Sequence, residues 1–230
     1  MKILSVIPAR SGSKSLKDKN IKLFNNLPLL SYSIKYSLKS KLITQTIVST
    51  DSIKYAKISE KFGASVPFIR PKVLSKDNVQ DFPVIKHALL NSEKYFSCIF
   101  DLVVLLRPTS PLRPSNLIEN GVEKMIKNRN ASSLRSITLS NEHPYRQWLL
   151  SSNKKYIHGY QSDVLESYNL PRQSLNQTYF QTGDIEIIRR ETILRGSISG
   201  NKIMPLIIDR KEMLDIDDID DWNNLLKRNN

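Results

Sequence analysis

This sequence of 230 residues lacks the residues of several common kinds of site. Its only cysteine, Cys98, excludes an intrachain disulfide and leaves multi-cysteine zinc sites without ligands. Its three histidines do not have the spacing of metal ligands. The chain also contains no GxSxG nucleophile elbow, no GxxxxGK(S/T) phosphate-binding loop and no GxGxxG dinucleotide fingerprint. A catalytic or nucleotide-binding site must therefore be recognised from other patterns.

Long apolar runs are also absent. No segment approaches the roughly 18 apolar residues that a membrane-spanning helix needs. The N-terminal stretch MKILSVIP is too short an apolar run for a signal peptide. We therefore expect a cytoplasmic protein with no membrane partner. At this length the chain is most simply a single domain, residues 1–230.

Acidic residues are outnumbered by basic ones, 22 against 35, so the formal net charge is +13. Such an excess can reflect a nucleic-acid partner, a substrate with several phosphates and a carboxylate, or a compositional bias of the surface. The lysines are scattered along the chain, and no block of five or six like charges occurs. This scatter favours the surface bias as the main source of the excess.

Short apolar or β-branched runs alternate with segments of helical periodicity. The expected strands are 2–8, 44–50, 102–106, 131–139, 183–188 and 202–209. The expected helices are 27–40, 52–64 (stopped by Gly63), 82–96, 114–128 and 219–228. This alternation predicts an α/β fold with a mostly parallel central sheet flanked by helices. Because ligands bind beyond the carboxyl ends of such strands, the loops after Ile7, Thr50 and Leu106 should share one functional edge.

Residues 139–180 break the alternation. They contain aromatics and turn residues but show no clear helical period. We expect an excursion of short strands and loops that forms a lid or a subunit contact.

The loop after the first strand, in SVIPARSGSKSLKDKNI, combines small residues and hydroxyls with basic side chains. Small residues let backbone N–H groups face a ligand, and Arg10, Lys14, Lys17 and Lys19 can neutralise several negative charges. The loop suits a triphosphate, and the alternative is a mobile, solvated basic loop.

Two further clusters could carry chemistry. Asp215 and Asp217 lie two residues apart, so in an extended segment their side chains leave the same face and suit Mg²⁺. The alternative is a solvated acidic turn before the last helix. Arg107 and Arg113 flank hydroxyls at the end of the strand 102–106, where the sheet rule places ligands. The alternative there is a rigid turn with exposed arginines.

Taken together, IPARSGSKSLKDKNI, LLRPTSPLR and DIDDIDDW resemble the acylneuraminate cytidylyltransferases, which are the CMP-sialic acid synthetases and their relatives for other nine-carbon keto-sugar acids. The resemblance runs from Lys2 to about Leu226 and is strengthened by IVSTD, IRP and LPRQ. It implies a Rossmann-like nucleotidyltransferase fold in which CTP and a 2-keto sugar acid give the CMP-sugar and pyrophosphate. It also implies a homodimer made through the excursion.

The resemblance implies roles for individual residues. The implied nucleotide-binding residues are Arg10, Ser13, Lys14, Lys19, Asn20, Arg70, Asn78 and Gln80. The implied substrate-binding residues are Arg107, Arg172 and Gln173. Asp215 and Asp217 match the pair that binds Mg²⁺ (or Mn²⁺), and Lys19, Arg10, Asp217 and Arg172 are the implied catalytic residues.

Three positions depart from the family's pattern. Arg107 stands where the family more often has glutamine, and Asn78 and Gln80 stand where it has hydroxyl residues that read the nucleotide. TGDIE, residues 182–186, replaces the NGAIY typical of sialic-acid enzymes. This last difference argues against assuming that the sugar is N-acetylneuraminate itself and not a bacterial relative of that sugar, such as legionaminate or pseudaminate. The alternatives are a cytidylyltransferase for 3-deoxy-manno-octulosonate or another sugar and, remotely, a nucleic-acid-binding protein, which the acidic DIDDIDD cluster fits poorly.

Overall fold

The computed structural model describes residues 1–161 and 163–227. Ser162, inside the expected excursion, and residues 228–230, which include the expected end of the last helix at Arg228, lie outside the described residues. No helix in the described part combines the length and the apolar character needed to cross a bilayer.

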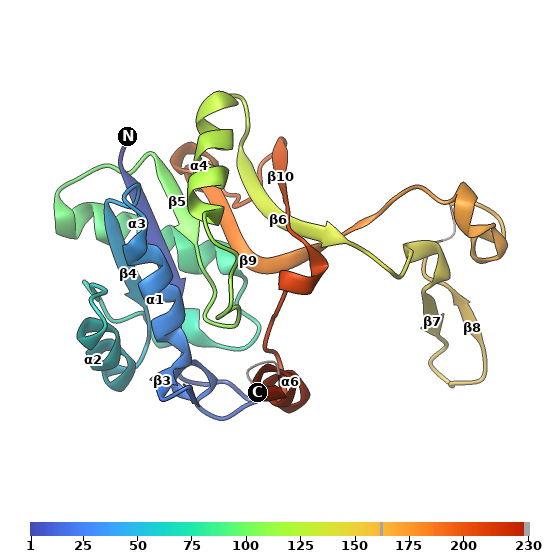
Figure 1. Ribbon diagram of the computed structural model, residues 1–230, viewed down its shortest axis with the longest axis horizontal. Helices are drawn as coiled ribbons and strands as arrows, with labels where there is room; N and C mark the ends of the chain where they lie inside the picture. Colours follow the sequence, from blue (N-terminus) through green and yellow to red (C-terminus); the bar gives the residue numbers. More distant parts are fainter. Residues whose placement is uncertain (162, 228–230) are drawn as a thin grey trace.

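A six-stranded sheet forms the centre of the molecule (Figure 1). Its strands, in spatial order, are β10 (Ile203–Ile207), β6 (Ser133–Leu139), β9 (Tyr179–Arg189), β5 (Leu102–Leu105), β1 (Ile3–Pro8) and β4 (Gln45–Ser49). β9 runs antiparallel to β5 and β6, while the other neighbouring pairs are parallel. The mostly parallel sheet is therefore confirmed, with one antiparallel strand in its middle.

Helices cover both faces of this sheet, since apolar side chains of its strands point to both faces and pack against helices there. Along β1, Ile3 and Ile7 pack into one apolar cluster while Leu4 and Val6 pack into the other, as the period of two requires. The first cluster includes side chains of α1 (Leu29–Lys39), α2 (Ile53–Lys61) and α4 (Leu117–Lys127). The second includes side chains of α3 (Asp81–Phe96) and α5 (Arg190–Leu194). The flanking helices expected from the sequence are thus confirmed.

A third apolar cluster joins the two ends of the chain. Leu16 and Phe24, from the segment after β1, pack with Ile216 and with Trp222 and Leu225 of α6 (Ile219–Lys227). This segment also contains two short antiparallel strands, β2 (Leu23–Phe24) and β3 (Leu27–Pro28). This apolar packing by itself brings the basic loop and the acidic C-terminal segment together.

The chain leaves the sheet between β6 and β9, and Leu139 pairs with Tyr179 where it leaves and returns. The segment between them, residues 140–178, is here called the arm. It contains the antiparallel strands β7 (Trp148–Leu150) and β8 (Ile157–Gly159) and short 3₁₀ turns. Figure 1 shows it extending away from the sheet. The irregular excursion expected over 139–180 therefore has the predicted limits and character.

Candidate active site

A cavity of about 650 Å³ lies at the carboxyl ends of β1 and β5, and we call it the edge cavity. It is lined by the loop after β1, by the segment that leads into α3, by the turn after β5 and by Asp217. Its charged lining residues are Arg10, Lys14, Lys19, Arg70, Lys76, Asp77, Asp81, Arg107 and Asp217. Six of these nine are cations, so the cavity suits an anionic ligand.

The basic loop is held in place by its neighbours in the sheet. The backbone N–H and the hydroxyl of Ser11 donate to the two carboxylate oxygens of Asp51, which follows β4, at 2.9 and 3.0 Å. The buried Asn20 donates from Nδ2 to the carbonyl of Arg10 at 2.9 Å and so closes the loop on itself. The loop is therefore an ordered cradle, and Asn20 braces it in addition to lining the cavity.

Lys19 connects the two ends of the chain at this cavity. Its Nζ donates to the carbonyl of Ile216 at 2.7 Å and lies 3.5 Å from Oδ1 of Asp217. Ser15 adds a hydrogen bond to the carbonyl of Asp217 at 2.6 Å. Residues about 200 positions apart in the sequence thus face the same space.

Asp77 occupies part of the cationic wall. Its carboxylate lies 2.6 Å from Lys14 Nζ and 2.5 Å from Arg10 Nη1, and these two cations hold the pKa of the Asp77 carboxyl below its usual value. Arg10, Lys14 and Asp77 are all at the surface of the cavity, where water weakens such pairs. An anion with several charges can therefore take the place of Asp77.

Arg70 is the most unusual cation of the site. Its side chain is buried, with 4% of the residue exposed, and its Nε and Nη2 atoms have no hydrogen-bond partner among the described residues. Burial lowers the pKa of Arg70, although the charge of Asp51 opposes this. A buried guanidinium with free donors costs stability unless a ligand satisfies it. Its place in the cavity wall therefore points to an anionic or polar ligand.

Arg107 also lines the cavity, but its guanidinium is already paired. Nη1 donates to Glu186 Oε1 at 2.6 Å and Nη2 donates to Asp81 Oδ2 at 2.5 Å. Arg113, in contrast, is half-buried outside the cavity lining and braces the turn after β5: it donates to the carbonyls of Asp184 and Arg107. Of the two arginines, only Arg107 lines the cavity, and the contacts of Arg113 agree with the rigid turn that the sequence left open as the alternative.

The candidate metal residues occupy an extended segment. Leu214 and Ile216 are buried while Asp215 and Asp217 are less so, which agrees with the expected alternation. The Asp217 carboxylate lines the cavity, and Oδ1 of Asp215 is buried without a hydrogen-bond partner among the described residues. No group of three or more possible metal-binding side chains occurs in the described part of the chain. Two carboxylates nevertheless fit Mg²⁺, because this ion typically takes one or two carboxylates together with substrate phosphates and water.

Five candidate residues with an implied role lie outside the cavity lining, and the metal candidate Asp215 is one of them. Asn78 and Gln80 are exposed on either side of Val79, which does line it. Arg172 and Gln173 are exposed on the arm, in a short 3₁₀ turn. Arg10, Ser13, Lys14 and Lys19 of the loop after β1 lie in the lining as expected, whereas the exposed Lys17 lies outside it.

Sequence reasoning missed Asp77, Asp81 and Glu186 as partners of the cavity's arginines. Each acts across a gap of 26 to 79 residues, so no local spacing reveals it. The only sequence signal was that TGDIE, which contains Glu186, departs from the pattern of the sialic-acid enzymes.

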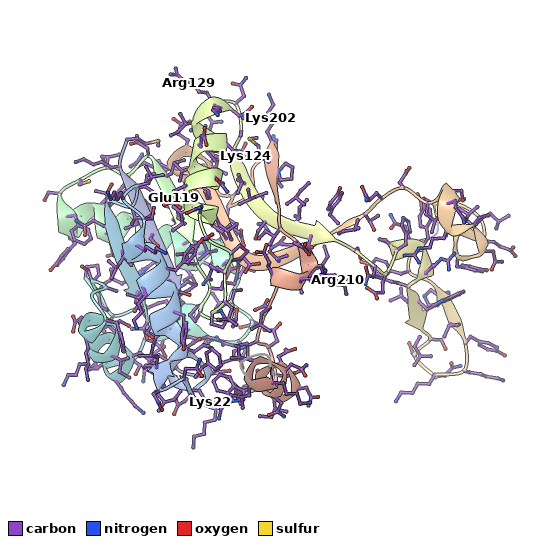
Figure 2. All side chains as sticks on the ribbon, viewed as in Figure 1. Lys22, Glu119, Lys124, Arg129, Lys202 and Arg210 are labelled. Carbon is purple, nitrogen blue, oxygen red and sulfur yellow. The ribbon has the colours of Figure 1, made fainter. Side chains whose placement is uncertain are left out.

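Positive charge outside the cavity is not confined to one face. Figure 2 shows Lys124, Arg129 and Lys202 near the end of α4 and the start of β10, whereas Lys22 lies at the opposite end of the molecule. This spread agrees with a compositional bias of the surface and contrasts with the cations that converge in the cavity.

A mostly parallel sheet with a cation-lined cavity beyond the carboxyl ends of its strands defines a Rossmann-like nucleotidyltransferase fold. Residues 4–212 match the family model described as cytidylyltransferase, so the chain belongs to the cytidylyltransferase family.

Two curated proteins are similar over most of their length. Post-translational flagellin modification protein B of Campylobacter coli is 33% identical over 94% of this chain and 89% of its own. The CMP-N,N'-diacetyllegionaminic acid synthase of Legionella pneumophila is 32% identical over 96% of this chain and 94% of its own. Among solved structures, a CMP-2-keto-3-deoxy-manno-octonic acid synthetase complexed with CTP aligns with a TM-score of 0.73. That alignment covers 99% of this chain and 98% of the other at 13% identity, so it supports the fold alone.

Proposed function

We propose that this protein transfers CMP from CTP to a nine-carbon 2-keto sugar acid and releases pyrophosphate. The observation that carries the proposal is the buried Arg70, which has two donors without a partner among the described residues and lines one cavity with Arg10, Lys14, Lys19 and Asp217. A nucleoside triphosphate supplies the negative charge that this wall lacks. The relative from Legionella pneumophila, named a synthase of a CMP-linked nine-carbon acid, supports the choice of nucleotide and acceptor.

In the proposed reaction the anomeric hydroxyl of the sugar acid attacks the α-phosphorus of CTP. A bond forms between the anomeric oxygen and the α-phosphorus, the bond from that phosphorus to the bridging oxygen breaks, and the hydroxyl proton is released. Such transfers depend mainly on positioning and on neutralisation of charge. Arg10 and Lys14 bind the triphosphate once it displaces Asp77, and Lys19 stabilises the departing pyrophosphate. Arg70 fixes the nucleotide through its buried donors.

Asp217 and Asp215 would hold Mg²⁺ or Mn²⁺ in this proposal. The ion supplies further neutralisation of phosphate charge. Lys19 would lie beside this ion, since its Nζ is held by the carbonyl of Ile216 and lies 3.5 Å from Oδ1 of Asp217.

In this proposal the working enzyme is a homodimer made through the arm. Arg172 and Gln173 are outside the edge cavity of their own chain. The arm also exposes large apolar side chains, among them Leu150, Tyr156 and Leu165, which is 93% exposed. A second copy would cover these apolar groups and bring Arg172 to its edge cavity, where the guanidinium could bind the substrate's carboxylate bidentately.

The sugar acid that we propose is of the legionaminate or pseudaminate type. Glu186 and Asp184 stand in the TGDIE segment, and Glu186 pairs with Arg107 at the cavity wall. This charged arrangement differs from the NGAIY pattern of the sialic-acid enzymes, so the acceptor contacts should differ as well.

A pyrophosphate-release assay tests the function. CTP, UTP, GTP and ATP are each combined with N-acetylneuraminate, N,N'-diacetyllegionaminate, pseudaminate and 3-deoxy-manno-octulosonate. We expect release only with CTP, and most rapidly with legionaminate or pseudaminate. If turnover occurs only with 3-deoxy-manno-octulosonate, that sugar acid is the acceptor and the proposed legionaminate or pseudaminate type is wrong. Salt-sensitive binding of nucleic acid without any turnover would contradict the proposal as a whole.

A further inference from the structure

Glu186 lies between two arginines that come from neighbouring strands. On β9 it is opposite Leu105 of β5 on one side and Arg135 of β6 on the other. Its Oε1 accepts from Arg107 Nη1 at 2.6 Å, and its Oε2 lies 3.3 Å from Arg135 Nη2. Only 1% of Glu186 is exposed. The carboxylate is therefore shielded from water and contacts Arg107 on the side away from the cavity.

Asp81 holds the same guanidinium from the other side. It begins α3, lines the cavity and accepts from Arg107 Nη2 at 2.5 Å. A planar guanidinium that is anchored through both terminal nitrogens has little freedom to rotate. Two of its five N–H donors are used by these bonds, which leaves the others for a ligand.

The two carboxylates also change what Arg107 can recognise. Burial alone would lower its pKa, but the charges of Glu186 and Asp81 raise the pKa of Arg107 above its ordinary value. Arg107 therefore stays protonated, and the carboxylates of Glu186 and Asp81 both offset its positive charge. Unlike Arg70, which has buried donors without a partner and no ion pair among the described residues, it does not attract an anion strongly. Its remaining donors suit an uncharged oxygen.

The place of Arg107 in the sheet indicates which substrate it meets. The nucleotide candidates come from β1 and from the side of β4, where the backbone N–H of Arg70 bonds to the carbonyl of Thr50. Arg107 follows β5 and is paired with β9, on the side of the sheet that leads into the arm. The acceptor sugar should therefore lie at the Arg107 end of the cavity, between the nucleotide and the arm.

We propose that Glu186 is a positioning residue that holds Arg107 as an oriented donor to an uncharged oxygen of the sugar acid, a hydroxyl or an acyl carbonyl. Glu186 thereby sets the affinity for the acceptor and leaves the affinity for CTP unchanged. This inference rests on the proposed function, because it assigns a substrate to one end of the same cavity.

The test is E186Q in the full-length protein, with KM and kcat measured separately for CTP and for the preferred sugar acid. We expect KM for the sugar acid to rise about tenfold, because a weakened anchor misplaces a substrate-binding group. KM for CTP and kcat should each stay within about twofold. R107L should show the same selective rise, and the double variant should be no worse than R107L, because Glu186 acts through Arg107.

The matched control is E93Q. Glu93 is also a buried glutamate in an ion pair with an arginine, since its two oxygens accept from Nε and Nη2 of Arg190 at 2.7 and 3.0 Å, but it lies outside the cavity lining. E93Q should lower thermal stability as E186Q does and leave both KM values unchanged. If E186Q fails to fold, D81N, which weakens the partly exposed anchor, should still raise KM for the sugar acid alone.

Three results would overturn the inference. A wild-type enzyme that turns over CTP with a sugar acid, together with an E186Q variant whose KM values match those of E93Q, would refute the role of Glu186 and leave the proposed function intact. If the effects of E186Q and R107L on KM for the sugar acid add in full in the double variant, Glu186 acts independently of Arg107. A wild-type enzyme inactive with every sugar acid would overturn the proposed function and this inference with it.

Discussion

The edge cavity and the arm differ in how their functional side chains are supported. In the cavity, Lys19 is held by backbone carbonyls and Arg107 by two carboxylates of the same chain. On the arm, Arg172 is exposed and large apolar side chains such as Leu165 have no cover. The cations of the first region are supported within one chain, whereas Arg172 and Leu165 of the second are exposed, and we propose that a second copy covers them. The comparison separates the chemistry, which we assign to the cavity, from the acceptor contacts, which we divide between the cavity and a partner's arm.

The largest expected effect lies in the cavity. D217N should reduce turnover by at least about 100-fold, because it removes a charged oxygen donor at the point where phosphate charge must be neutralised. The fold should persist, since the Asp217 carboxylate is exposed. Steady-state pyrophosphate release and thermal denaturation measure the two quantities. D220N, on the exposed first turn of α6, is the control and should remain active; normal turnover in D217N would refute the assignment.

Loss of Lys19 should have the next largest effect. K19A should lower kcat about 30-fold and change KM for CTP less, because the ammonium stabilises the leaving group more than the ground state. Single-turnover kinetics with saturating CTP measure the chemical step. The exposed neighbour Lys17 provides the control variant K17A. If K19A raises only KM for CTP, Lys19 does not stabilise the leaving group.

The arm should affect the acceptor alone. R172A should raise KM for the sugar acid about tenfold without changing KM for CTP, because a carboxylate loses its guanidinium partner. If the arm serves a second copy, dissociating and reassociating R172A with D217N should restore the wild-type KM for the sugar acid in about a quarter of the sites, since half of the dimers are mixed and each has one intact site. If verified mixed dimers show no such recovery, Arg172 either serves the site of its own chain or has no part in catalysis.

The smallest expected effect concerns Asp77. D77N should lower the Kd of CTP about threefold, because it removes an internal anion that competes for Arg10 and Lys14, and exposed ion pairs of this kind contribute little. Isothermal titration with CTP measures the change. N78D, next to it but outside the lining, should move the affinity in the opposite direction or not at all. Weaker CTP binding by D77N would show that Asp77 positions Arg10 for the nucleotide.

Much of the fold could be predicted from the sequence because its signals are local. Apolar periodicity located the six sheet strands and the long helices, and the sheet rule placed the loops after β1 and β5 at one edge. The element limits were less accurate. β9 spans Tyr179–Arg189 and not only 183–188, and α2 ends at Lys61, two residues before Gly63. The additional residues of β9 pair with β6 at the root of the arm, which periodicity does not reveal.

The candidate site was predictable where residue type and loop position suffice. Composition singled out the cations of the basic loop, and the spacing of Asp215 and Asp217 agrees with their extended segment. The bond of Arg113 to the carbonyl of Asp184 and the pairing of Arg107 with Glu186 depend on contacts between distant segments. A sequence records the charge of an arginine but not the carboxylates around it, so the free Arg70 and the compensated Arg107 looked alike.

A crystal structure of the protein with CTP and Mg²⁺ tests the central claim most directly. The account predicts triphosphate oxygens within hydrogen-bond distance of Arg10, Lys14 and Lys19, with Asp77 displaced and the ion on Asp217. A nucleotide bound elsewhere, with the Arg10–Asp77 and Lys14–Asp77 pairs intact, would contradict it.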